Sequence, residues 1–178
     1  RQNRLDEAAA KFDRAHALRP DIPQPLINGA MAFARLGRLN EAENRLVQAT
    51  GLPEPCAEAH FNLGLLHAEL GRRDAAAKEL YRTLELAPKN AAAACNLAIL
   101  KAGTDYPETF RLLQQAIEAD PLNPRYVHTL AFYYLETHQF DAAQETIRQA
   151  RQRGVNSPEL QVLLREILAR LPEAKPAR

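Results

Sequence analysis

The sequence predicts an all-α protein in which helical hairpins stack into an α-solenoid. Similar segments recur at equal steps along the chain: NRLDEAAAKF begins at Asn3, GRLNEAENRL at Gly37 and GRRDAAAKEL at Gly71. Small residues and large apolar residues recur in the same register. Prolines close three of the units, where a helix must end: Pro20, Pro88 and Pro121. A repeat period of about 34 residues is typical of stacked helical hairpins.

The recurring columns indicate which helices of the hairpins meet. An interior glycine such as Gly64 weakens a helix by roughly 0.5–1 kcal/mol relative to alanine, so a close approach of another backbone must compensate. We therefore expect the second helix of its own hairpin to lie against Gly64. The small residues of the first helices are Ala30, Gly64, Ala98 and Ala131; those of the second helices are Ala8, Ala42, Ala76 and Ala143, with Thr109 as the exception; the large apolar column is Phe12, Leu46, Leu80, Leu113 and Ile147.

The columns resemble those of the tetratricopeptide repeat family, whose unit is a helix–turn–helix of about 34 residues. The segment AEAHFNLGLLHAELGRRDAAAKELYRTLELAPKN, residues 57–90, matches nearly throughout, and the resemblance covers about residues 1–171. It implies a right-handed superhelix. His60 and His67 depart from the family pattern, which usually has aromatic residues there, and Thr83 stands where alanine is expected.

The resemblance and the period together predict the following order of elements. We expect residues 1–3 to end a first helix and Leu5–Leu18 to form its partner. The predicted segments are a partial repeat 1–22, repeats 23–56, 57–90, 91–123 and 124–157, a capping helix 158–171 and a disordered tail 172–178. The chain begins without methionine, so we expect it to be a piece of a longer polypeptide, and no localisation is predicted.

Helix-start signals and an apolar stripe define the predicted capping helix. Ser157 followed by Pro158 is a suitable N-cap and first helical residue. The stripe consists of Leu160, Leu163, Leu164, Ile167, Leu168 and Leu171. Arg165 stands in the small-residue column, where its long side chain would block a following second helix. We therefore expect the array to be capped here.

Composition argues against several classes of function. The formal net charge is +1, so no nucleic acid partner is expected. No apolar run approaches the roughly 20 residues of a membrane span, so no membrane insertion is expected. Cys56 and Cys95 form no disulfide framework and are interpreted as structural thiols. No catalytic motif or cofactor-binding motif is present, so the sequence predicts neither an enzyme nor a cofactor.

The histidines and arginines are interpreted as structural rather than as site residues. His60 and His67 lie two helical turns apart on the packing face, without a carboxylate partner nearby in the sequence, and no metal site is predicted. Arg148, Arg151 and Arg153 cluster at the end of a helix, where cations complement the helix dipole.

The opposite face of each first helix mixes amide and apolar residues. Three columns recur there: Asn28, Asn62, Asn96 and Thr129; Met31, Leu65, Ile99 and Phe132; and Ile27, Phe61, Cys95 and His128. Stacked helices would turn these columns into stripes on a concave wall. Asparagine offers an acceptor and two donors, which suit a peptide backbone, and the resemblance implies this role for the asparagines.

We therefore hypothesise that the chain is a protein-interaction scaffold that binds a partner peptide or an amphipathic helix in its concave groove. The candidate peptide-binding residues are Asn28, Met31, Phe61, Asn62, Leu65, Asn96, Ile99, Thr129 and Phe132. The carboxylate clamp known in the family is not expected, because the nearest positions hold Gln24, Glu58 and Ala92 rather than lysine.

Three alternatives stay open at this point. In the first, the mixed columns serve only the packing between adjoining helices. In the second, self-association through the incompletely covered Leu5 and Phe12 builds a homo-oligomer. In the third, the array tethers a catalytic or cytochrome domain of a larger protein.

Overall fold

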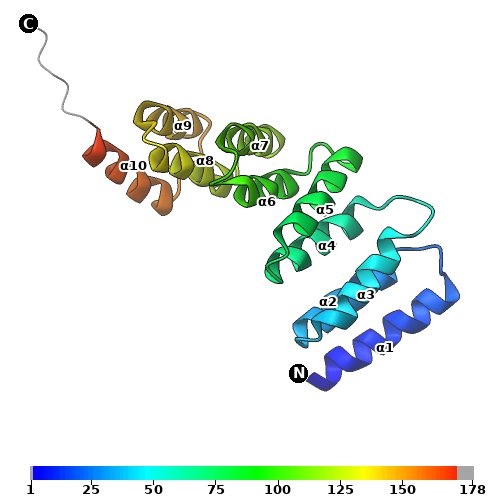
Figure 1. The fold of residues 1–178 in the computed structure, drawn as a ribbon. Helices are drawn as coiled ribbons and strands as arrows, with labels where there is room; N and C mark the ends of the chain where they lie inside the picture. The colour runs from blue at the N-terminus through cyan, green and yellow to red at the C-terminus, as the bar shows by residue number, and fades with distance from the viewer. Residues whose placement is uncertain (1, 172–178) are drawn as a thin grey trace, which may run out of the picture. The chain divides into compact units, whose positions relative to one another are not determined.

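The computed structural model describes residues 2–171, which form ten α-helices and no strand. Figure 1 shows their order along the chain. Their bounds are α1 Gln2–Leu18, α2 Gln24–Arg35, α3 Leu39–Thr50, α4 Ala57–Glu69, α5 Arg73–Leu86, α6 Ala91–Lys101, α7 Tyr106–Ala119, α8 Pro124–Glu136, α9 Phe140–Gln152 and α10 Pro158–Arg170. The all-α, solenoid-type prediction is confirmed, because successive helices pair as hairpins.

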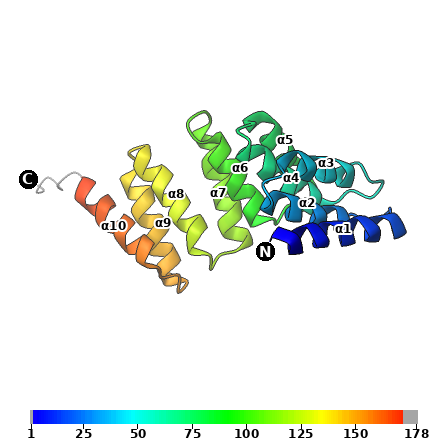
Figure 2. The ribbon, with the colours of Figure 1, turned by 90° about the horizontal axis from the view of Figure 1, so that it is seen from below.

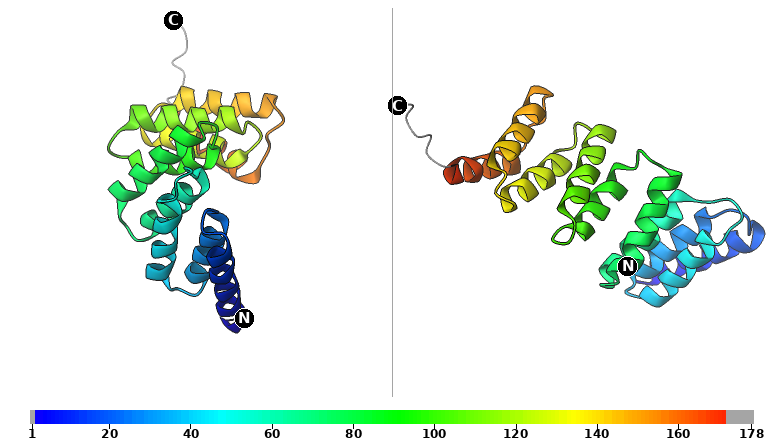
Figure 3. Two further views of the ribbon diagram at one scale, coloured as in Figure 1. Left: turned by 90° about the vertical axis from the view of Figure 1, so that its right-hand side faces the viewer. Right: turned by 45° about the horizontal axis from the view of Figure 1, so that its top comes forward.

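The chain forms two compact units, Arg1–Pro88 and Lys89–Arg178. The first unit contains α1 and the hairpins α2–α3 and α4–α5, and the second contains the hairpins α6–α7 and α8–α9 followed by α10. Figure 2 shows α8, α9 and α10 side by side within the second unit, and Figure 3 shows its two hairpins from another direction. Each unit has its own buried apolar core.

Each of the four hairpin turns contains a residue with positive φ, which in the turn between α6 and α7 is Gly103, at 84°. Gly37 and Gly71 provide it in the first unit, with φ of 74° and 72°. In the turn between α8 and α9 the equivalent position, two repeats after Gly71, is His138, with φ of 59°. Glycine accepts this conformation without steric penalty, whereas histidine adopts it only in a minority of cases. The turn geometry of the hairpin is therefore kept even where the sequence loses its glycine.

Gly64 lies where α4 meets the second helix of its own hairpin, as predicted. A Cβ atom added to Gly64 would stand 3.0 Å from Cγ of Leu80, 3.2 Å from its Cδ2 and 3.4 Å from the carbonyl oxygen of Ala76. Leu80 and Ala76 belong to α5 and are fully buried. The glycine thus allows two helices of one hairpin to approach closely, and its role is structural.

The N-terminal element differs from the prediction in one respect. The expected helix end within residues 1–3 is wrong, because a single helix α1 continues from Gln2 through Leu5 to Leu18. Nothing in this segment interrupts a helix, since glycine and proline are absent from it. Leu5 and Phe12 are half-buried, and Phe12 packs against α2 at Gly29, whose added Cβ would lie 3.6 Å from Cβ of Phe12.

The start of α10 agrees with its predicted signals. The hydroxyl Oγ of Ser157 accepts a hydrogen bond from the backbone N–H of Leu160 at 3.2 Å, and Pro158 is the first helical residue. The predicted apolar stripe is only partly buried. Leu160, Leu163 and Ile167 are buried in the core shared with α8 and α9, whereas Leu168 is 48% exposed. The predicted disordered tail, 172–178, lies outside the described residues.

Candidate functional site

The first unit brings three predicted site residues together beside one hollow. Met31 from α2 and Asn62 and Leu65 from α4 line a cavity of about 140 Å³. Its remaining lining residues are Ala30, Ala34, Ala42, Leu46, Leu66 and Glu69. Met31 is 44% exposed, and Leu65 is half-buried. We call the surface formed by Asn28, Met31, Asn62 and Leu65 the first-helix face of the first unit.

The amide groups on this face are partly engaged with their own helix. Nδ2 of Asn62 donates to the carbonyl oxygen of Glu58 at 2.9 Å, which leaves the acceptor Oδ1 and one N–H of the amide for other partners. Asn28 is half-buried and makes no side-chain hydrogen bond with another described residue. At the helix starts, Nε2 of Gln24 donates to Oε2 of Glu58 at 3.1 Å, joining α2 to α4.

The second unit carries the same arrangement on α6 and α8. Nδ2 of Asn96 donates to the carbonyl of Ala92 at 2.7 Å, and Oγ1 of Thr129 donates to the carbonyl of Arg125 at 2.8 Å. One turn further along each helix, Ile99 and Phe132 are both 39% exposed. Asn96, Ile99, Thr129 and Phe132 make up the first-helix face of the second unit.

Two residues of one predicted column, Ile27 and Cys95, do not belong to these faces. Ile27 and Cys95 are fully buried, so their expected place on the binding wall is wrong. Each of them precedes a residue of the Asn column by one position, which is a rotation of about 100° around the helix axis. Their side chains therefore point toward the neighbouring helices. Burial also raises the pKa of the Cys95 thiol. The other two members, Phe61 and His128, are half-buried.

The interior histidines do have carboxylate neighbours, contrary to the sequence interpretation. Nδ1 of His60 lies 2.7 Å from Oε2 of Glu79 on α5, and both side chains are largely buried. Nδ1 of His67 lies 3.8 Å from Oε1 of Glu43 on α3, which also binds Arg72 at 2.6 Å. Each carboxylate belongs to a different helix from its histidine, so only the pairing of helices brings them near. Over residues 2–171, no group of three or more His, Cys, Asp or Glu is placed to hold a metal ion.

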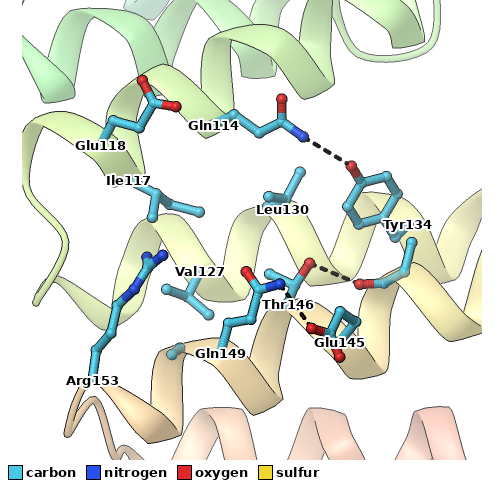
Figure 4. A pocket seen from close by; sticks show the side chains of 12 residues that line it. Gln114, Ile117, Glu118, Val127, Leu130, Tyr134, Glu145, Thr146, Gln149 and Arg153 are labelled. Atoms are coloured by element: carbon cyan, nitrogen blue, oxygen red, sulfur yellow. Dashed lines mark hydrogen bonds between the residues drawn. The ribbon is translucent and has the colours of Figure 1, made fainter.

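Sequence reasoning missed a groove in the second unit, away from its first-helix face (Figure 4). Its volume is about 360 Å³, and α7 and α9 form its two walls while α8 forms its floor. Ile117 lies on the α7 wall and Gln149 on the α9 wall, Arg153 follows the end of α9, and Leu130 lies between the walls. Nε2 of Gln114 donates to the hydroxyl of Tyr134 at 3.4 Å across one end.

The repeat register explains why this groove is open. Val127 and Thr146 line it, and they stand at the positions that His60 and Glu79 occupy two repeats earlier. In the first unit those two longer side chains meet at 2.7 Å and occupy the equivalent space. The smaller side chains at these two positions, compared with those of the earlier repeat, are the sequence signal that could have revealed the groove.

Comparison with protein families identifies the repeats. Residues 27–91 and residues 100–171 each match a model described as tetratricopeptide repeat, and together the two matches cover most of the chain. The chain belongs to the tetratricopeptide repeat family. No curated protein matches the sequence.

Solved tetratricopeptide structures have the same fold at low sequence identity. The crystal structure of MamA superposes with a TM-score of 0.73 at 19% identity, over 84% of this chain and 88% of MamA. PilF of Pseudomonas aeruginosa gives 0.75 at 15% identity, over 94% and 81%. YrrB, described as a tetratricopeptide protein with an unusual peptide-binding site, gives 0.70 at 17% identity, over 90% and 83%.

The tetratricopeptide fold is that of a protein-interaction scaffold, and tetratricopeptide proteins are in general non-catalytic. Among the helices of residues 2–171, none has the length and apolar composition of a membrane span.

Proposed function

We propose that this tetratricopeptide chain binds an extended or helical segment of a partner protein on its first-helix faces. One observation carries the proposal: on the first-helix faces, each of the four first helices has a large apolar side chain at the same register, one turn after an Asn or Thr. Three of these four side chains, Met31, Ile99 and Phe132, rank among the exposed large apolar residues, and Leu65 is half-buried.

The chemistry of the faces suits a peptide. Full burial of a side chain of this size contributes about 1.5–3 kcal/mol, so partial cover of several of them gives measurable affinity. The free oxygen of Asn62 accepts from a backbone N–H, and the amide of Asn28 has both donor and acceptor capacity. The peptide-binding site named for YrrB supports this use of the fold.

The proposal assigns a binding role and no catalysis to the chain. Self-association through Leu5 and Phe12 stays a prediction, and α2 already covers part of Phe12.

A random peptide library selected against the full chain tests the proposal. Peptides that bind the first-helix faces should lose at least tenfold in affinity to the Leu65→Glu and Ile99→Glu variants, because a carboxylate replaces an apolar contact. Val47→Glu is the matched control, since Val47 is a similarly exposed apolar residue but lies on the second helix α3. Affinity is measured by fluorescence anisotropy, and circular dichroism checks that each variant is folded.

If the selected peptides bind Leu65→Glu and Ile99→Glu as tightly as the unmodified chain, the first-helix faces are not the binding site. Equal losses with Val47→Glu would have the same meaning, because the effect would then be one of charge rather than of position.

A further inference from the structure

A second surface, formed by α9 and α10, has the composition of a helix-docking site. It surrounds a hollow of about 410 Å³. The lining residues are Gln144, Ile147, Arg148, Arg151, Gln152 and Leu164. This surface lies apart from the first-helix faces, none of whose residues lines the hollow.

The repeat register shows what kind of element fits there. Arg148, Arg151 and Leu164 stand one repeat period after three residues that line the groove formed by α7, α8 and α9, namely Gln114, Ile117 and Leu130. In that groove, α9 supplies the second wall. The α9–α10 surface therefore repeats the groove one unit later, and no helix of residues 2–171 supplies its second wall.

Apolar side chains are available to such a helix. α10 uses Leu160, Leu163 and Ile167 to pack in the core with α8 and α9. Leu164 is only half-buried, and Leu168, in register with the groove-lining Tyr134, is 48% exposed. A docked helix would cover both leucines.

The charges on this surface are basic. Arg148 on α9 is paired with Glu145 at 2.6 Å, whereas Arg151 and Arg165 make no ion pair with another described residue. Arg165 stands one repeat period after Ala131, which is fully buried and occupies the register of Gly64, the residue that meets the second helix of its own hairpin. If an ordinary repeat helix packed here, with a small residue facing Arg165, the guanidinium of Arg165 would have no partner. The side chains of residues 172–178 carry a net charge of +1 and offer only one carboxylate, Glu173.

We propose that the α9–α10 surface binds an amphipathic acidic helix of a partner protein, which takes the place of a second helix in the next hairpin. Apolar residues of the partner helix pack on Leu164 and Leu168, and its carboxylates pair with Arg151 and Arg165. Desolvated arginine–carboxylate pairs at such a contact add specificity, because a basic helix would be repelled.

Two synthetic helical peptides test this proposal on the full chain. Both carry leucines at positions i, i+3, i+4 and i+7; the first has glutamates on the flanks of this stripe, and the second has lysines at the same positions. The acidic peptide should bind at least tenfold more tightly than the basic one, and its binding should weaken with added salt. Arg151→Glu and Arg165→Glu should each reduce its affinity at least tenfold, as measured by fluorescence anisotropy.

Control variants distinguish this surface from the rest of the chain. Arg82→Glu, a change at another exposed arginine, on α5, should leave the affinity unchanged, and so should Val47→Glu on α3. The proposal is overturned if both peptides bind equally, if Arg151→Glu and Arg165→Glu have no effect, or if Val47→Glu causes the loss instead. It is also overturned if a chain ending at residue 171 binds the acidic peptide tenfold more tightly, because the chain's own C-terminal residues would then occupy the surface.

Discussion

Two helical glycines in the first unit have different neighbours, and this difference sets the effect of adding a methyl group. At Gly64 a Cβ would meet the fully buried Leu80 at 3.0 Å, whereas at Gly29 the nearest atom, Cβ of Phe12, lies at 3.6 Å. The first distance is too short for an ordinary contact, and the second is normal. The same substitution is therefore expected to act in opposite directions.

We predict that Gly64→Ala lowers the free energy of unfolding by about 1 kcal/mol. Overpacking costs about 1–3 kcal/mol, while the gain in helix propensity returns about 1 kcal/mol. Gly29→Ala should instead raise the free energy of unfolding by about 0.5–1 kcal/mol. Urea unfolding measures both. In a Leu80→Ala background the Gly64→Ala change should become stabilising; a persistent loss there would show that Leu80 is not the cause.

Glu145 provides a second prediction at the residue scale. Arg148 and Gln149 donate hydrogen bonds to its carboxylate at 2.6 and 2.8 Å and hold its pKa at about 2, below the usual 4.5. Because the pKa is lowered in the folded chain, this interaction stabilises the fold above about pH 4.5 and is lost as the pH falls toward 2. An NMR titration should place the Glu145 midpoint near 2, and Arg148→Met should move it toward 4.5. An unchanged midpoint in that variant would contradict the pairing.

At the scale of single elements, helix starts differ between the two units. The side chains of Asn90, Asp105, Asn123 and Ser157 accept hydrogen bonds at the starts of α6, α7, α8 and α10. The starts of α2, α3, α4 and α5 have no such side-chain bond, and in the second unit the start of α9 also has none. Local sequence thus marks the helix starts of the second unit more strongly, while in the first unit the period and the turn glycines mark them.

We predict that Ser157→Ala lowers the free energy of unfolding by about 1 kcal/mol, because the N–H of Leu160 loses its acceptor. Ser157→Asp should keep most of the stability, since aspartate is an equally good N-cap. Chemical denaturation compares the two variants. Equal losses for Ala and Asp would mean that the hydroxyl, rather than capping in general, is needed at this position.

The pair of His60 and Glu79 shows an interaction between elements that local sequence did not indicate. Both side chains are largely buried, at 13% and 16% exposure, so removing one partner leaves the other without its hydrogen bond. We predict that His60→Ala lowers the free energy of unfolding by about 1–3 kcal/mol. The double variant His60→Val/Glu79→Thr, which copies the residues at the equivalent register of the second unit, should recover part of this loss. No recovery would mean that the pair is not the source of the effect.

At the scale of the whole chain, the two compact units each have a buried core of their own. In the second unit, α10 contributes Leu160, Leu163 and Ile167 to the core that contains Ile147 and Leu135. Repeat arrays depend on the contacts between neighbouring elements, so the end helix has a large effect on its unit.

We therefore predict that a fragment of residues 89–178 is helical and unfolds cooperatively on heating, as measured by circular dichroism. A fragment of residues 89–156, which lacks α10, should lose the cooperative transition because it exposes the apolar side of α8 and α9. A shorter fragment that unfolds as cooperatively as the longer one would show that α10 is dispensable for the core.

The sequence by itself determined the helical class, the hairpin repeat and the positions that pack closely. Period and residue size suffice for these, because small residues in register allow two helix backbones to approach wherever they occur. The register of Asn28, Met31 and their equivalents on the faces of the first helices also follows from the period. The start of α10 follows from Ser157 and Pro158, whose effects are local.

Only the tertiary structure decided which residues of those faces are accessible and which interior groups have partners. Ile27 and Cys95 point in a different direction around the helix axis from Met31 and Ile99. The neighbouring helices determine which of these two sides of the helix is buried. The contact of His60 with Glu79, and the open groove beside Val127 and Thr146, arise between different helices. Accessibility and pairing depend on what lies across the contact, so a single helix pattern does not specify them.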